Sequence, residues 1–183
     1  MASFSRVLPL TVAAALFIEQ MDSTIIATSL PDIAADLGTS PISLKLAFTT
    51  YLLGLTVLLP ISGWLADRFG ARTVFSLAIV VFTSASVACG FADGLGMLVV
   101  CRGLQGAGAA LMVPVGRIIV LRAVRKDQLL DAIAWLTIPA LIGPVIGPPI
   151  GGYITTVYDW RWIFWMNLPF GIFALCLALW KLP

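Results

Sequence analysis

The chain has 183 residues, of which 60% are hydrophobic and 11% charged, and its mean hydropathy of +1.03 lies far above the range of soluble domains. This composition predicts a protein embedded in a lipid bilayer, and the formal net charge of +2 excludes the clustered basic surface that nucleic-acid binding requires. Because histidine is absent and Cys89, Cys101 and Cys176 lie inside apolar runs without ligand spacing, we expect no metal site, no cofactor and no enzymatic activity.

A membrane-spanning helix needs about 20 mainly apolar residues, and six windows of the sequence meet this requirement. In chain order they cover approximately residues 7–30, 46–66, 73–92, 95–121, 130–157 and 161–181. The sequence therefore predicts an all-α membrane protein, a single six-transmembrane-helix bundle over residues 1–183. Glu19, Gln20 and Asp22 interrupt the first window, which also lacks a cleavage pattern, so we interpret it as a retained helix and not as a signal peptide.

Positive charge is distributed unevenly among the predicted loops. Lys45 and Arg161 are the basic residues on one side, where acidic residues accompany them. The other side carries most of the Lys and Arg, namely Arg6, Arg68, Arg72, Arg122, Arg125, Lys126 and Lys181. Since cytoplasmic loops of membrane proteins are enriched in Lys and Arg, we expect both termini in the cytoplasm and the bundle in the plasma membrane.

The short segment GWLADRFGART, residues 63–73, joins the second and third predicted helices. Gly63 would allow a close helix approach, Asp67 could pair with an arginine at a helix end, and Gly70 would form the turn. A plain basic hairpin would account for the glycine and for Arg68 and Arg72, but not for the order of the residues. This order resembles the signature loop of the major facilitator superfamily, and the resemblance implies a cytoplasmic gate whose charge contacts form and break during transport.

Three ionisable residues, Glu19, Asp22 and Arg102, fall inside predicted spans, where charge is costly and a function is the default interpretation. With a rise of about 1.5 Å per residue, Glu19 and Asp22 lie about 18 and about 22 Å from the inner boundary, and Arg102 about 20 Å from it. Because the two carboxylates also share a helix face, we expect the three side chains to meet at one depth. Either a carboxylate binds the coupling proton and Arg102 tunes it, or the three form a static ion pair between helices.

The fourth window continues from Arg102 as RGLQGAGAA, with Gln105 one turn further along. This run resembles the fourth-helix motif of the superfamily, which implies a role for Arg102 in proton transfer. We expect Gln105, Glu19 and Asp22 to face the substrate, and the small residues to serve close helix packing. Arg117, nearer the cytoplasmic end, is assigned to topology alone.

The fifth window contains IGPVIGPPIGG, residues 142–152, in which glycine recurs at every fourth position. The pattern predicts a bent helix with one flat stripe that packs tightly against a neighbour. A kinked packing helix would be a sufficient explanation. The order also resembles the antiporter motif of superfamily exporters, which implies export, and the residues that carry it are Gly143, Pro144, Gly147, Pro148, Gly151 and Gly152.

Two further segments, MDSTIIATSLP from Met21 and WRWIFWMNLPFG from Trp160, are similar to the fourteen-helix drug:proton antiporters of the superfamily. Glu19 departs from that pattern, so the sequence leaves open whether Glu19 or Asp22 carries the proton. The resemblance ends after the sixth helix. It implies the N-terminal half of a major facilitator fold, built as a 3+3 inverted repeat.

Two functions remain open at this point. The first is proton-coupled efflux of small lipophilic or cationic compounds by a transporter of which this chain forms the N-terminal half. The second is a non-transporting fragment or half-module that acts only after pairing with a second six-helix bundle. The expected partners are the lipid bilayer, protons, a small-molecule substrate and that second half, supplied by another chain or by a missing C-terminal part.

Overall fold

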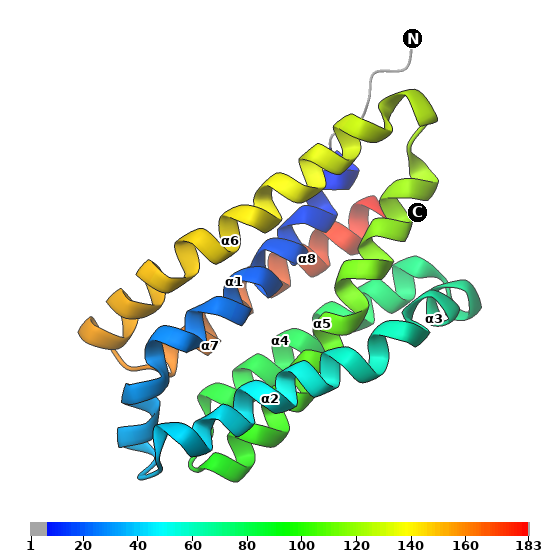
Figure 1. Ribbon diagram of the computed structural model, residues 1–183. Helices are drawn as coiled ribbons and strands as arrows, with labels where there is room; N and C mark the ends of the chain where they lie inside the picture. The colour runs from blue at the N-terminus through cyan, green and yellow to red at the C-terminus, as the bar shows by residue number, and fades with distance from the viewer. Residues whose placement is uncertain (1–6, 183) are drawn as a thin grey trace.

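Over residues 7–182, which it describes, the computed structural model consists of helices joined by short connections, with no strand (Figure 1). Six helical stretches within these residues are long and apolar enough to cross a bilayer, which confirms the predicted all-α bundle of an integral membrane protein. The second stretch combines α2, η1 and α3, and the sixth combines α7 and α8. In chain order the elements are α1 (Val7–Asp36), α2 (Pro41–Leu58), η1 (Leu59–Ile61), α3 (Ser62–Phe69), α4 (Ala71–Gly90), α5 (Leu95–Ala123), η2 (Lys126–Gln128), α6 (Leu129–Val157), α7 (Trp162–Trp165) and α8 (Asn167–Lys181).

Some helices extend beyond their predicted apolar windows. α1 passes through Pro31 without a break and ends later than expected, and α2 begins earlier, with the Ser40 hydroxyl accepting a hydrogen bond from the Ser43 backbone N–H. A hydropathy window detects only the part of a helix that lies in lipid, whereas backbone hydrogen bonding and capping continue the helix past the lipid boundary. The expected cytoplasmic placement of Arg6 falls outside the described residues.

The helix contacts follow a twofold pattern. α1 packs along α6 and α8, α5 packs along α2 and α4, and α4 and α8 contact each other between these two groups (Figure 1). Exchanging α1 with α5, α2 with α6 and α4 with α8 leaves this set of contacts unchanged. Since successive spans run in opposite directions, the first three spans correspond to the last three with inverted orientation, which is the predicted 3+3 inverted repeat.

The glycine stripe of α6 packs against α1. A Cβ added at Gly143 would lie 2.9 Å from the Phe17 carbonyl oxygen, and a Cβ at Gly151 would lie 2.8 Å from the Ile25 carbonyl oxygen. Gly147, between them, faces the same helix. Because side-chain carbons cannot approach backbone atoms this closely, the glycines are what allows α1 and α6 to pack at this distance. α6 remains one continuous helix through its prolines.

The corresponding approach of α2 to α5 uses glycines other than the expected one. A Cβ at Gly54 would lie 3.0 Å from the Ala107 nitrogen, and a Cβ at Gly106 would collide with the Tyr51 backbone. A Cβ at Gly63 would meet no described atom within 4 Å, so the prediction that Gly63 allows a close helix contact is wrong.

The apolar surface of the bundle is concentrated on α2 and α6, whereas α1, α4 and α5 are largely buried. Large side chains on α2 and α6 are exposed over half of their surface or more, including Ile42, Leu53, Val57, Leu141, Val145 and Tyr153. Contiguous apolar surface of this extent requires lipid or another apolar partner.

Candidate functional site

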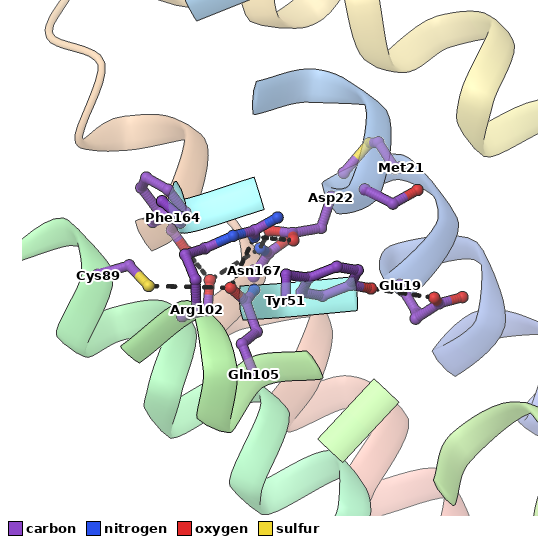
Figure 2. Close-up of polar contacts among 12 residues, drawn as sticks. Glu19, Met21, Asp22, Tyr51, Cys89, Arg102, Gln105, Phe164 and Asn167 are labelled. Atoms are coloured by element: carbon purple, nitrogen blue, oxygen red, sulfur yellow. Dashed lines mark hydrogen bonds and ion pairs between the residues drawn. The ribbon is translucent and has the colours of Figure 1, made fainter. Parts of the chain in front are cut away.

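The centre of the bundle holds a buried ion pair between α1 and α5 (Figure 2). The Arg102 Nη1 donates to the Asp22 Oδ2 over 2.7 Å, and the two side chains are 0% and 1% exposed. Asp22 lies in the middle of α1 and Arg102 near the start of α5, and these helices run in opposite directions. The 2.7 Å contact shows that the two positions lie at the same depth, and the structure brings Asp22 and Arg102 together.

The second oxygen of the Asp22 carboxylate is held from α8. The Asn167 Nδ2 donates to the Asp22 Oδ1 over 2.6 Å and also to the Ser86 Oγ over 2.9 Å. The Ser86 hydroxyl in turn donates to the Phe164 carbonyl oxygen over 3.0 Å. Sequence reasoning used Asn167 only as part of a resemblance and missed Ser86. The available signal was a polar side chain in the middle of an apolar helix, because such a group must find a hydrogen-bond partner.

Glu19 does not contact Arg102 directly. Its Oε1 accepts a hydrogen bond of 3.1 Å from the Tyr51 hydroxyl of α2, and its Oε2 has no partner among the described residues. The Tyr51 ring centre lies 4.4 Å from the Arg102 guanidinium carbon, which is within the range of a cation–π contact. The expectation that all three ionisable residues meet therefore holds for Asp22 and Arg102 only, because Tyr51 stands between Glu19 and the arginine (Figure 2).

Gln105 extends the cluster along α5. Its Oε1 accepts a hydrogen bond of 2.8 Å from the Arg102 Nη1. Gln105, Asp22 and Glu19 are all buried, so none of the three expected substrate-facing residues lies on the surface of the bundle. The Arg102 Nε and Nη2 and the Gln105 Nε2 have no acceptor among the described residues. Since an unpaired buried donor is costly, these groups favour the entry of water or of a solute that offers acceptors.

The loop between the second and third spans contains an exposed ion pair. Asp67, at the end of α3, accepts from the Arg122 Nη2 over 2.7 Å, and the side chains are 63% and 61% exposed. Gly70 has φ of +86° and forms the turn into α4, and Arg72 donates to the Leu179 carbonyl oxygen over 2.5 Å. Asp67 thus pairs with an arginine, as expected. The arginine is Arg122 at the end of α5, which the sequence analysis used only as one of the basic residues that indicate the cytoplasmic side.

Arg68, the remaining charged residue of this loop, is exposed.

A second charged cluster lies at the opposite end of the bundle. The Arg161 Nη1 is 2.9 Å from the Asp36 Oδ2, which also accepts from the Trp160 Nε1 over 3.1 Å. Asp36 ends α1 and Arg161 follows α6. When the two repeats are exchanged, the end of α1 corresponds to the end of α5, and the end of α6 to the end of α3. Asp36 therefore corresponds to Arg122 and Arg161 to Asp67, so the same pair occurs with the charges exchanged. Each end of the half-bundle is therefore joined by one pair of this kind.

Comparison with known proteins agrees with this architecture. A family model for the Major Facilitator Superfamily matches residues 12–183. A protein of Cronobacter sakazakii that carries the name multidrug resistance protein MdtD is 45% identical over 172 residues, which are 94% of this chain and 36% of that protein. Its namesake in Yersinia enterocolitica is 43% identical, again over 94% of this chain and over 37% of its own length.

Solved structures share the fold at low sequence identity. The proton:xylose symporter XylE bound to 6-bromo-6-deoxy-D-glucose matches with a TM-score of 0.84 at 14% identity, over 94% of this chain and 44% of that chain. A D-xylose-proton symporter matches with a TM-score of 0.85 at 15% identity, over 99% of this chain and 49% of that chain. The chain thus spans 36% of the MdtD relative and about half of the symporters. With its six spans, their inverted-repeat packing and a family match over almost its whole length, the chain belongs to the major facilitator superfamily.

Proposed function

We propose that this chain forms the N-terminal six-helix half of a proton-coupled exporter of small lipophilic or cationic compounds, with both termini in the cytoplasm. The observation that carries the proposal is the fully buried pair of Asp22 and Arg102 inside the bundle of a transporter family. The relatives named multidrug resistance protein support the substrate class. The glycine and proline order of α6 supports the direction of transport.

In this proposal, a proton and a cationic solute compete for Asp22, so binding of one excludes binding of the other. When Asp22 is ionised, its oxygens accept from Arg102 and Asn167, and the charge of the arginine is balanced. A proton on Asp22 removes that balance, and a cationic solute beside Asp22 competes with both the proton and the arginine. We therefore assign the coupling proton to Asp22, whose charge decides the state of Arg102. Glu19, with its unpartnered oxygen, is assigned to solute contact, together with Gln105.

The two ion pairs at the ends of the bundle serve as latches in this proposal. Both join helices of opposite repeats or their connecting loops. The pair of Asp67 and Arg122 is exposed and can form and break at low energetic cost, whereas Arg161 in the other pair is partly buried. The cytoplasmic latch of this proposal is the pair of Asp67 and Arg122, and Arg68 and Arg72 belong to the same loop as Asp67.

The second candidate is a half-module that becomes functional only on pairing with another six-helix bundle. The exposed apolar faces of α2 and α6 favour it, as does the share of the MdtD relatives that the chain spans. The two candidates are compatible if the partner completes a transporter, and they differ if the assembly binds but does not transport.

Transport in proteoliposomes separates these alternatives. The 183-residue chain is reconstituted alone and together with the part of the Cronobacter sakazakii MdtD protein that follows the matched segment, and ethidium movement is followed under an imposed pH gradient. We expect transport only in the paired sample, and Asp22→Asn should abolish the part that depends on the gradient. Ser84→Ala is the matched control, because Ser84 is exposed and donates only to its own helix.

Undiminished gradient-dependent transport by Asp22→Asn would overturn the coupling role of this residue. Transport by the chain alone would overturn the need for a second half. A stable paired assembly without transport in either direction would favour the half-module.

A further inference from the structure

The Asp22 carboxylate is connected to the junction of α7 and α8 through two uncharged side chains. Asn167 is the first residue of α8, and Phe164 belongs to α7, so the two helices of the sixth span meet between them. Ser86 of α4 lies between Asn167 and the Phe164 carbonyl oxygen. Asn167 and Ser86 are 0% exposed, and together they form a continuous path of hydrogen bonds from Asp22 to a backbone carbonyl.

Each hydrogen bond of this path has a defined direction. The two hydrogens of the Asn167 amide nitrogen are donated to Asp22 Oδ1 and to Ser86 Oγ. Ser86, which accepts from Asn167, can then use its single hydroxyl hydrogen only as a donor, and it donates to Phe164. The Asn167 Oδ1 is buried and has no donor among the described residues. The Asn167 side chain that donates to Asp22 therefore also carries an unused hydrogen-bond acceptor.

We propose that Asn167 and Ser86 form a relay that positions the Asp22 carboxylate and transmits its protonation to the Phe164 carbonyl at the junction of α7 and α8. This inference rests on the proposed role of Asp22 as the proton site. Asn167 and Ser86 act through Asp22, so they are positioning residues.

Protonation of Asp22 reverses the relay in a sequence that conserves every hydrogen. A proton from water adds to Oδ1, since Oδ2 is engaged by Arg102. The new O–H faces the Asn167 amide hydrogen, and two donors cannot face each other, so the amide turns by half a rotation and presents Oδ1 instead. The same turn places Oδ1 opposite Ser86. The hydroxyl then rotates to donate to Asn167 and leaves the Phe164 carbonyl with one donor fewer.

The Phe164 carbonyl is placed where such a change can act. It also accepts from the Met166 backbone N–H at the last turn of α7, directly before α8 begins. The Phe164 ring lies 5.9 Å from the Arg102 guanidinium carbon, so the same residue contacts the ion pair from its other side. Loss of the Ser86 hydrogen bond weakens the attachment of this junction to α4 and allows α7 to move relative to α8.

The titratable groups around Asp22 come from α1, α2, α4 and α5. They are Glu19 on its own helix, Tyr51 from α2, Cys89 from α4 and Arg102 from α5. α8 contributes no titratable group to the cluster and supplies Asn167 instead. α6 faces α1 at this level with its glycine stripe, which is likewise uncharged. Asn167 is therefore the group that can carry the signal toward the sixth span.

Infrared difference spectroscopy tests the relay directly. The full 183-residue chain is placed in lipid nanodiscs with an isotope label on the Phe164 carbonyl, and spectra at low and high pH are subtracted. We expect the Asp22 carboxyl band, assigned by its loss in Asp22→Asn, and the labelled Phe164 band to change over the same pH interval. In Asn167→Ala and in Ser86→Ala the Asp22 band should still respond while the Phe164 response is lost. Ser84→Ala, on the same helix, should behave as the unmodified chain.

The outcomes are distinguishable. A Phe164 response that persists unchanged in both Asn167→Ala and Ser86→Ala, or that is absent from the unmodified chain while Asp22 titrates, overturns the relay. If Asp22 shows no protonation band, the proposed proton site fails. In that case the carboxylate stretching bands of Asp22 test whether Asn167 positions this carboxylate. Asn167→Ala should shift these bands and Ser84→Ala should not. Bands that Asn167→Ala leaves unshifted overturn the positioning role. Ser86→Ala provides the second test if Asn167→Ala does not fold.

Discussion

At the scale of single residues, Arg102 determines the energetics of the site. Its guanidinium is 0% exposed and its one charged partner within ion-pair distance among the described residues is Asp22. Replacing one partner of a buried pair leaves the other as an uncompensated charge, which costs more than removing both.

We therefore expect Asp22→Asn or Arg102→Gln alone to lower the free energy of unfolding by about 3–5 kcal/mol. The double variant should recover part of this loss, because no unpaired charge remains. Denaturation in detergent of the four forms gives the coupling energy directly. Additive effects of the two substitutions would show that the pair contributes no specific interaction.

Tyr51 has two separable contacts, one through its hydroxyl and one through its ring. Tyr51→Phe removes the hydrogen bond to Glu19 but keeps the ring beside Arg102, so we expect a loss of about 1–3 kcal/mol. Tyr51→Ala also removes a fully buried aromatic ring, for which about 3–5 kcal/mol is expected. Thermal unfolding compares the two variants. Equal destabilisation would mean that the ring contact is unimportant.

At the scale of helices, the glycine stripe of α6 is the feature that decides packing. Gly147→Ala would bring a Cβ to 3.1 Å from the Met21 carbonyl oxygen and closer still to the Thr24 hydroxyl, whereas Gly152→Ala meets nothing within 4 Å. We expect Gly147→Ala to destabilise the bundle by about 1–3 kcal/mol through overpacking. Gly152→Ala should be neutral, and it serves as the matched control in the same unfolding measurement. Equal effects would show that α1 and α6 can separate freely.

The proposed latch of Asp67 and Arg122 lies at the ends of α3 and α5. Because the pair of Asp67 and Arg122 is exposed, Asp67→Asn and Arg122→Gln should change the unfolding free energy by less than about 1 kcal/mol. In the paired transport assay both variants should nevertheless slow ethidium movement, and the exchange Asp67→Arg with Arg122→Asp should restore it. Transport that stays unchanged in the single variants would remove the latch role.

At the scale of the whole molecule, the uncovered apolar faces of α2 and α6 are where we expect the second half to pair. After replacement of the native cysteines, single reporter cysteines at Leu53 and Val145 should react with a lipid-soluble maleimide in the lone chain and become protected on assembly with the second half. Reporters at Leu77 on α4 and Phe173 on α8 should react equally in both samples. Protection at all four positions, or at none, would contradict the assignment of α2 and α6 as the pairing faces.

The depth of the charged residues could be predicted from the sequence, and their partners could not. Counting residues from the helix ends placed Asp22 and Arg102 at one level, because the rise of a helix is constant. The same counting placed Glu19 there too, but its contact depends on the direction in which its side chain leaves the helix and on Tyr51 from α2. Asn167 and Ser86 lie far from Asp22 along the chain, and no local pattern connects them.

The sequence by itself determined six apolar helices of membrane-spanning length, because each apolar run must satisfy its backbone hydrogen bonds within its own helix. The inverted repeat was implied by the resemblance of its motifs to a known superfamily. Only the tertiary structure decided which glycines bring helices together, which arginine pairs with Asp67, and which groups hold the Asp22 carboxylate. These contacts join side chains from different helices, so they depend on the rotation of each helix about its axis, which hydropathy leaves undefined where a helix is apolar on all sides.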